Sequence, residues 1–277
     1  MRFLSGRAAT LRHTFLDDED VMAVPAVSVT VRDASGATVY TGSASSSGDE
    51  WRVTSSPLPI GVYTASWVAE GLASDQDNFE VTGGFLFTIP EARASDSDLE
   101  DKSRFPAAKV RHYREVVEAE FERITGRSFT PRSTQAEVEG DGTRTLYLGY
   151  LDVTAIAAVN GPSGPLDVTS WTVDPHGFVT APYDLPEGTR YTVAFTYGFA
   201  LAPDDVKRAG LIRLRSLLTA ERSGVPDRAT AFVAAEGGNF TLATPGRGGS
   251  ETGIPEVDAT LKRYRFEVFY DVFGVGQ

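Results

Sequence analysis

The sequence of 277 residues contains no cysteine and only three histidines. The absence of cysteine excludes a disulfide scaffold, a thiolate metal site and a cysteine nucleophile. Positive charge is also scarce, because 26 lysine and arginine residues stand against 38 aspartate and glutamate residues and leave a net charge of −12. So acidic a chain is a poor candidate for a protein that coats duplex DNA.

Long apolar runs are missing as well. The N-terminal residues contain no apolar stretch of signal-peptide length, and no segment approaches the roughly 20 apolar residues of a membrane span. Hydrophobic residues nevertheless make up 41% of the chain, and a length of 277 residues suits one or two globular domains. We therefore expect a globular protein with no membrane among its partners.

The excess of acidic residues is confined to the first two thirds of the chain. Residues 1–95 carry 6 basic and 12 acidic side chains, and residues 96–200 carry 10 and 16. Residues 201–277 are balanced, with 10 of each. The balanced segment fits a part of the chain that meets other proteins.

The first ninety residues have the pattern of short strands. Val27, Val29 and Val31 alternate with polar residues, which is the period of a half-buried strand. Further strand-like runs recur at intervals of roughly ten residues, which predicts an all-β sandwich over residues 1–92. Residues 27–36 and 58–64 resemble phrases of bacterial immunoglobulin-like modules, a fold that hosts many unrelated functions.

The period of the apolar residues changes after residues 91–98, a small and polar segment that we interpret as a linker. The next segment predicts an amphipathic helix over residues 106–125. Its apolar positions are spaced by 3, 4, 4 and 3 residues: Val110, Tyr113, Val117, Phe121 and Ile124.

The rest of the chain alternates again between strand and helix patterns. Residues 128–200 have strand-like patterns, and a second helix is expected from Pro203 to about Arg222. Residues 223–253 are glycine-rich and irregular, which in a compact domain indicates a binding loop or disorder. A short helix beginning near Pro255 ends the predicted elements.

The residue types that carry chemistry form no recognisable constellation. His13, His112 and His176 show no metal-ligand spacing, and residues 17–20 form an acidic run without the spacing of a calcium loop. The glycines of residues 246–253 lack the lysine and hydroxyl ending of a phosphate-binding loop. We therefore expect no catalytic residue, no metal site and no cofactor, and we predict that the protein is not an enzyme.

Three arginines form one basic row on the second predicted helix. Arg208, Arg215 and Arg222 lie seven residues apart and so share one helix face. The row can be a solvated face, it can pair with acidic residues of a neighbouring subunit, or it can face DNA. Our hypothesis for these residues is the contact between subunits.

Several phrases, taken in order, resemble one protein family. The first predicted helix ends in the phrase Thr-Gly-Arg-Ser-Phe-Thr-Pro-Arg at residues 125–132, and a β-rich segment follows it. The second helix opens with residues 203–209, and a terminal phrase covers residues 252–264. In this order the phrases resemble the head–tail connector (adaptor) family of long-tailed actinobacterial phages. The resemblance covers residues 98–265, and the N-terminal sandwich is a departure from the minimal family.

This resemblance implies a multi-domain chain: the immunoglobulin-like sandwich, followed by an α+β connector domain over residues 96–277. Within that connector domain the β-rich insertion covers about residues 128–200, and a docking tail covers about residues 224–277. The implied role is that of a structural virion protein in the neck, a self-associating ring that is expected to be a dodecamer. Its implied partners are the portal protein above, and the stopper or another neck protein below. DNA passes through without sequence-specific binding, and the sandwich faces outward, where it can contact the capsid.

A docking hypothesis follows for the C-terminal segment. Apolar residues at helical spacing and the aromatic residues after them are expected to bind the portal protein. These residues are Ile254, Pro255, Val257, Leu261, Tyr264, Phe266, Phe269 and Tyr270. The alternative function is a surface or carbohydrate-binding adhesin module, for which Trp51 or Trp67 in the sandwich would have to form an aromatic platform.

Overall fold

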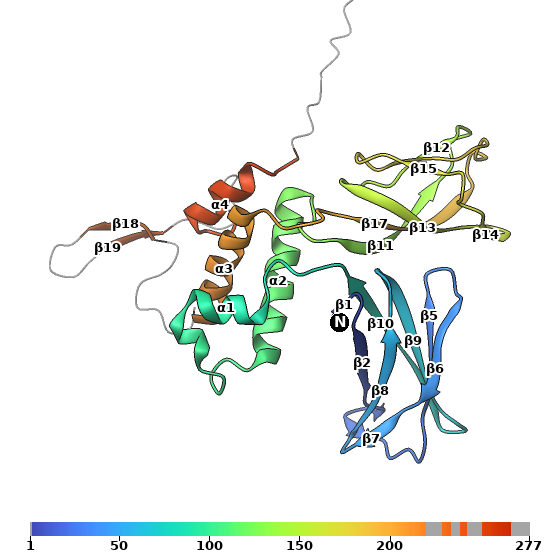
Figure 1. Cartoon of the computed structure of the whole chain (residues 1–277), viewed down its shortest axis with the longest axis horizontal. Helices are drawn as coiled ribbons and strands as arrows, with labels where there is room; N and C mark the ends of the chain where they lie inside the picture. Colours follow the sequence, from blue (N-terminus) through green and yellow to red (C-terminus); the bar gives the residue numbers. More distant parts are fainter. Residues whose placement is uncertain (1, 220–228, 234–238, 243–250, 267–277) are drawn as a thin grey trace, which may run out of the picture. The chain divides into compact units, whose positions relative to one another are not determined.

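The computed structural model describes residues 2–219, 229–233, 239–242 and 251–266 (Figure 1). The chain divides into two compact units, and each unit combines two separate segments. Met1–Phe85 and Thr130–Leu201 form the first, which we call the β unit. Leu86–Phe129 and Ala202–Gln277 form the second, which we call the helical unit.

In the first segment of the β unit, two sheets share one apolar core. The larger sheet has the order β1-β10-β9-β5-β6, with β1 parallel to β10 and all other neighbours antiparallel. The smaller sheet has the order β2-β8-β7, and β3 and β4 form a short separate hairpin. The strands are β1 (Arg2–Leu4), β2 (Ala8–His13), β3 (Leu16–Asp17), β4 (Asp20–Val21), β5 (Ser28–Asp33), β6 (Thr38–Ser43), β7 (Ser45–Ser47), β8 (Glu50–Pro57), β9 (Gly61–Ala69) and β10 (Ala73–Thr82).

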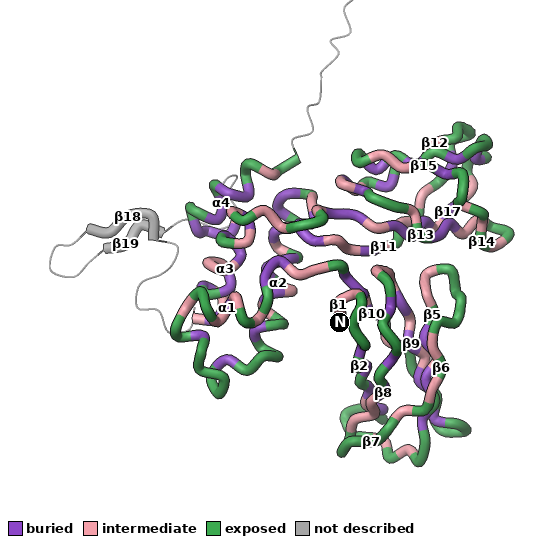
Figure 2. The backbone as a smooth tube through the Cα atoms, in the orientation of Figure 1, coloured by how far each residue is buried: buried purple, intermediate pink, exposed green. Residues whose placement is uncertain are grey.

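Alternating burial along the strands builds this core (Figure 2). On β5, Val29 and Val31 are fully buried, as the period-two pattern of the sequence predicts. Trp67 on β9 is also fully buried, and the ring of His13 stacks on its ring with centroids 5.2 Å apart. The core is therefore closed by aromatic side chains from both sheets.

The second segment of the β unit adds two further sheets around another apolar core. Their orders are β11-β17-β13-β14 and β12-β16-β15, and all described pairs are antiparallel. Val159, Val193 and Phe195 are fully buried between them. The strands are β11 (Arg132–Glu139), β12 (Thr145–Tyr147), β13 (Val153–Gly161), β14 (Gly164–Leu166), β15 (Thr172–Val173), β16 (Phe178–Thr180) and β17 (Arg190–Tyr197).

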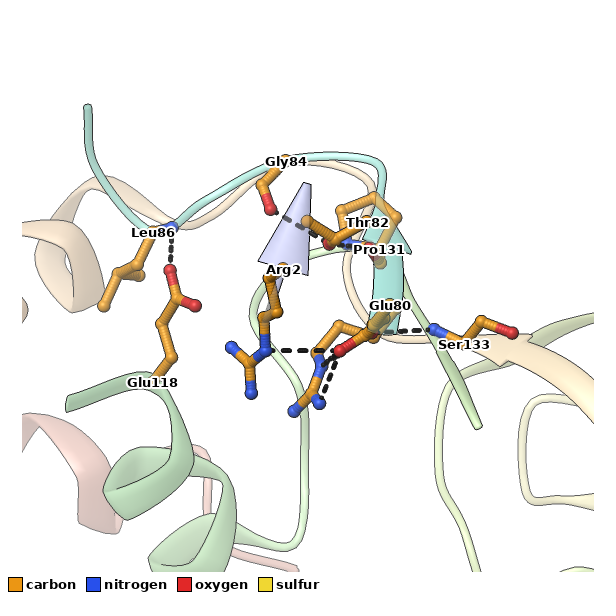
Figure 3. Close-up of polar contacts among 9 residues, drawn as sticks. Arg2, Glu80, Thr82, Gly84, Leu86, Glu118, Pro131 and Ser133 are labelled. Atoms are coloured by element: carbon orange, nitrogen blue, oxygen red, sulfur yellow. Dashed lines mark hydrogen bonds and ion pairs between the residues drawn. The ribbon is translucent and has the colours of Figure 1, made fainter. Parts of the chain in front are cut away.

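One carboxylate joins the two segments of the β unit (Figure 3). Glu80 on β10 pairs with Arg2 at 3.2 Å and with Arg132 at 2.9 Å, and it accepts the backbone N–H of Ser133 at 3.1 Å. Beside it, the backbone N–H of Gly83 donates to the carbonyl of Pro131 at 2.8 Å. The side chain of Glu80 is only 12% exposed, so these charge-assisted bonds lie largely out of water.

This junction is the physical reason for correcting the predicted fold class. The prediction of an all-β immunoglobulin-like sandwich followed by an α+β connector domain is wrong, because the chain is a mainly β protein of several sheets. The β-rich segment at residues 130–201 packs with residues 1–85 and does not form an insertion in an α+β fold. The domain limits of 1–92 and 96–277 remain a prediction, because the compact units of a structure need not coincide with domains that are delimited along the sequence.

The helical unit confirms the main predicted helices. Residues 106–125 form α2 with a difference of one residue, and the second predicted helix is present from Asp204 to Thr219. A hairpin of β18 and β19 lies within residues 223–253, which the sequence predicted to be irregular. The elements are α1 (Ile89–Ser95), the 3-10 helix η1 (Ser97–Glu100), α2 (Ala107–Thr125), α3 (Asp204–Thr219), β18 (Ala229–Val233), β19 (Asn239–Leu242) and α4 (Pro255–Lys262).

Helix α1 lies where the sequence suggested a linker. Thr88 is its N-cap and accepts the backbone N–H of Glu91, while the Glu91 side chain accepts the N–H of Thr88. This reciprocal capping box, together with Pro90 in the first turn, is a helix signal that composition alone conceals.

The apolar stripe of α2 packs as expected, but two of its charged residues are buried with it. Glu118 accepts the backbone N–H of Leu86 at 2.8 Å (Figure 3), and Arg114 donates to the carbonyl of Phe87 at 3.3 Å. On α3, an added Cβ at Gly210 would lie 2.5 Å from Leu86, so a glycine is needed there for close approach. Of the helices in the described ranges, none is long and apolar enough to cross a membrane.

Replacing Glu80 with glutamine should destabilise the β unit. The change removes the negative charge that pairs with Arg2 and Arg132 in a mostly buried position, so we expect a loss of about 2–4 kcal/mol. Urea unfolding measures the loss, and amide hydrogen exchange should become faster at Gly83 and Ser133.

The control is Glu70→Gln, which removes the same charge from an exposed residue of the same unit. It should change stability by less than about 0.5 kcal/mol. Equal losses in the two variants would contradict the role of Glu80 as the junction.

Candidate functional site

The histidines that the sequence left as candidates are placed in structural contacts. His13 lies in the core of the β unit and shares a hydrogen bond of 2.9 Å with Asp77. His112 contacts the neighbouring ring of Tyr113 on α2, and His176 lies in an exposed turn 3.8 Å from Asp174. No group of three or more histidine, aspartate and glutamate residues in the described ranges could hold a metal ion.

Two phrases of the head–tail resemblance, residues 125–129 of the first and residues 252–264 of the last, meet in the helical unit, and we take this place as the candidate site. Helix α2 ends at Gly126, which has a φ of 71° and donates its N–H to the carbonyl of Glu122 at 2.8 Å. The hydroxyl of Thr125 donates to the carbonyl of Phe121 at 2.8 Å and accepts the N–H of Arg127 at 3.2 Å. These bonds form the turn that the Thr-Gly-Arg phrase encodes.

The terminal phrase packs against this turn. The ring of Tyr264 meets the ring of Phe129 edge-on, with centroids 5.4 Å apart. The backbone N–H of Phe266 donates to the carbonyl of Thr125 at 3.1 Å. Residues separated by more than 130 positions are thus joined at the root of the C-terminal tail, which comprises residues 267–277 and lies outside the described residues.

Asp205 in the first turn of α3 connects a third element to this root. One of its oxygens accepts the hydroxyl of Tyr264 at 2.9 Å, and the other pairs with Arg263 at 2.9 Å. Burial, followed by the hydrogen bond to Asp205, raises the pKa of Tyr264. Asp205 is the functional candidate that sequence reasoning missed, because its acidic side chain was explained by its place at a helix terminus and nothing indicated its partners directly after α4.

The segment that leads into α4 is fixed by a buried carboxylate. Asp258 accepts both the backbone N–H and the hydroxyl of Thr252 at 2.8 Å. Ile254, Val257 and Leu261 are buried in the core of the helical unit. Packing within the chain therefore accounts for their helical spacing, which gives no separate indication of docking.

The remaining predicted docking residues are distributed differently. Pro255 is exposed, Tyr264 is half-buried, and the Phe266 side chain is 42% exposed. Phe269 and Tyr270 lie outside the described residues. Of the docking set, Phe266 is thus the large apolar side chain that the structure leaves at the surface near the tail root.

The arginine row has partners inside the chain. Arg208 on α3 pairs with Glu256 on α4 at 2.9 Å, and Arg215 pairs with Asp96, the N-cap of η1, at 2.8 Å. Arg222 lies outside the described residues. A contact between subunits stays a prediction for this row, and for Arg208 and Arg215 it has to compete with these ion pairs.

Comparison with known proteins shows only low similarity, and only to solved structures. No family model matches the sequence, and no curated protein matches it. Among solved structures, a chain from the neck of an empty GTA particle, computed with C6 symmetry, is 18% identical with a TM-score of 0.43. The likeness covers 66% of this chain and 90% of that one.

Two α2-macroglobulins are also similar, but less so. The trypsin-activated protein from Escherichia coli is 9% identical with a TM-score of 0.27, and the likeness covers 73% of this chain and 13% of that one. The Salmonella protein reacted with methylamine is 12% identical with a TM-score of 0.26, over 73% of this chain and 12% of that one. None of the three likenesses reaches the level at which a shared fold can be argued.

Replacing Asp205 with asparagine should loosen the tail root. The change removes the anionic acceptor of Tyr264 and the partner of Arg263, so we expect a loss of about 1–2 kcal/mol in the free energy of unfolding. It should also lower the pKa of Tyr264, which spectrophotometric titration can follow by difference from Tyr264→Phe.

Asp204→Asn is the matched control, because Asp204 is an exposed acid in the same first turn of α3. It loses only the helix-dipole contribution of about 0.3–1 kcal/mol and leaves the titration of Tyr264 unchanged. An identical effect of both variants would refute the contact to Tyr264 as the cause.

Glu91 should give the helical unit a measurable pH dependence. The hydrogen bond from Lys207, and then those from Thr88, lower the pKa of Glu91 to about 2 from 4.5. The folded pKa is thus below the unfolded one, so the carboxylate stabilises the fold above about pH 4.5, and this stability is lost as the pH falls toward about 2.

Glu91→Gln should therefore cost about 0.5–1 kcal/mol at pH 7, a small value because the Glu91 side chain is 41% exposed. The difference from the parent should disappear in acid, as measured by urea unfolding at several pH values. Glu100→Gln, an exposed residue of the same unit, serves as control, and a pH-independent cost of Glu91→Gln would contradict the assignment.

Proposed function

We propose that the protein is a structural component of a phage neck, a head-to-tail adaptor that forms a ring beneath the portal and extends the DNA channel toward the stopper and tail. The observation that carries this proposal is the convergence of the resembling phrases. They lie far apart in the sequence, but residues 125–129, Asp205 and residues 263–266 contact one another in one helical unit.

The distribution of charge supports a channel through which DNA passes. The β unit carries 8 basic and 19 acidic residues, a net −11, whereas the helical unit carries 18 and 19, a net −1. An acidic surface does not retain phosphate, so DNA can move past it. The balanced helical unit suits the contacts with protein, namely neighbouring copies, the portal protein and the stopper.

We propose a structural role rather than an enzymatic one, and localisation in the virion. The two mostly buried titratable groups His13 and Glu80 are engaged in the fold, His13 with Asp77 and Glu80 with Arg2 and Arg132. A contact between the N-terminal segment and the capsid remains a prediction.

The adhesin alternative has less support. It needs an aromatic platform on the first segment of the β unit, but Trp67 is fully buried and Trp51 packs against the same core. Neither indole therefore offers the open face on which a sugar ring would stack.

Ring formation tests the proposal directly. The full chain is produced alone and together with the portal protein of the same phage, and its mass and symmetry are measured by native mass spectrometry and electron microscopy. A rotationally symmetric ring, bound to the portal, is the expected outcome. A chain that stays monomeric under both conditions would falsify the proposal, and glycan binding by that monomer would favour the adhesin.

Phe266 is the residue through which portal binding can be probed. Phe266→Ser should weaken portal binding at least tenfold, because it removes the exposed aromatic side chain at the tail root without opening the core. Val116→Ser changes a comparably exposed apolar residue on α2 and should leave binding unchanged. Similar binding by both variants would exclude Phe266 from the interface while leaving ring formation as a separate question.

A further inference from the structure

Two aromatic side chains of the β unit are paired on its surface. Tyr147 on β12 lies directly opposite Phe178 on β16, and their ring centroids are 5.0 Å apart. Tyr147 is 54% exposed and Phe178 is 44% exposed. On the other face of this strand pair, the neighbouring residues Leu146 and Val179 are fully buried. One face of this sheet therefore packs on the core, and the other face exposes aromatic rings at the surface.

These rings form one wall of a surface hollow of about 510 Å³. The hollow is also lined by carboxylates, because Glu139 at the end of β11 and Asp141 after it both face it. Its complete lining is Val138, Glu139, Asp141, Thr145, Tyr147 and Phe178. Among the residues that the structure describes, no lysine or arginine lines this hollow.

The carboxylates of the hollow are available to a ligand. The hydroxyl and backbone N–H of Thr143 bind one oxygen of Asp141, at 2.6 and 2.9 Å, and hold the pKa of this carboxyl below its usual range. Asp141 is therefore ionised at neutral pH. Glu139 lies opposite Arg190 in the strand register, but no ion pair joins Glu139 to any residue in the described part of the chain.

We propose that this hollow binds an arginine side chain presented by a partner protein. A guanidinium group is planar and weakly hydrated, so it can stack on Tyr147 and Phe178 while its N–H groups donate to Glu139 and Asp141. The net charge of −11 on the β unit adds attraction over a longer range. This inference does not rest on the proposed function.

The chemistry of the lining distinguishes arginine from a sugar, the other common ligand of exposed aromatic rings. Sugar hydroxyls donate and accept hydrogen bonds, so their sites combine acceptors with donors. Here the charged groups accept only, and the hydroxyls of Thr145 and Tyr147 are the side-chain donors of the lining. Guanidinium is cationic and donates only, so it matches the two carboxylates, which are anionic and accept only.

The test follows the rings themselves. The full chain, with ¹³C-labelled tyrosine and phenylalanine, is titrated with N-acetylarginine N-methylamide, and the ring signals of Tyr147 and Phe178 are assigned from Tyr147→Leu and Phe178→Leu. Both signals should shift together along one binding curve. The uncharged citrulline analogue should bind at least tenfold more weakly, and free arginine, which carries a carboxylate, should bind more weakly than the capped compound.

Matched variants separate the hollow from general attraction to an acidic surface. Glu139→Gln should weaken binding at least fivefold, whereas Glu137→Gln, which removes the same charge from an exposed residue two positions earlier on β11, should change it less than twofold. Equal weakening by both variants would reduce the effect to diffuse attraction and overturn the proposal.

Three other results would also overturn it. The absence of any shift in both ring signals with the arginine compound would mean that no guanidinium site exists there. If cellotriose or chitotriose shifts these signals while the arginine compound does not, the hollow is a sugar platform. If free arginine binds as well as the capped compound, the ligand is the amino acid and not a protein side chain.

Discussion

The two segments of the β unit are joined at a carboxylate that is kept largely out of water. A mostly buried charge is tolerated only when its oxygens are satisfied, and Glu80 meets this condition with Arg2, Arg132 and the N–H of Ser133. Its partners come from the N-terminus and from a segment fifty residues further along the chain. The carboxylate thus fixes where the chain must return after α2, because Gly83 and Pro131 are held together beside it. The segment between Gly83 and Pro131, which contains α1 and α2, therefore forms a closed loop of the chain. The bonds at this junction offset the conformational entropy that is lost when the two ends of the loop are brought together.

The helical unit applies the same physical rule with different groups. Glu118 and Asp258 are buried carboxylates that accept backbone N–H groups of Leu86 and Thr252, so each fixes a segment that has no regular structure of its own. Arg213 on α3 adds a partly buried ion pair to α2, with distances of 2.7 and 2.8 Å to Glu120. These three acidic residues of the helical unit are therefore engaged in its internal packing. In the β unit, many acidic residues remain on the surface and set its charge.

Sequence patterns predicted what depends on neighbours along the chain and missed what depends on tertiary partners. The period of two around Val29 and the helical spacing in α2 depend on residues that are close in the sequence. The strand and the helix that they predicted are both confirmed. Glu80 follows the strand alternation in a way that is typical of a solvent-facing residue. Nothing nearby in the sequence indicates that it pairs with Arg132. The predicted fold class was wrong for the same reason. The strands of both segments were predicted, but nothing in the sequence indicated that the two segments pack together. Asp205 was recognised only as a helix-terminus acid, and its contacts with Arg263 and Tyr264 became visible only in the folded structure.

The C-terminal segment shows why apolar spacing alone cannot identify a docking surface. A helix that binds a partner and a helix that packs on its own core have the same spacing, so Ile254, Val257 and Leu261 could be read either way until their burial was known. What distinguishes a surface for a partner is the apolar area that remains after internal packing is complete. By this criterion Phe266 at the tail root and the aromatic pair on β12 and β16 are the informative residues. They lie in different units and in different electrostatic surroundings, so we expect each to suit a partner of different chemistry.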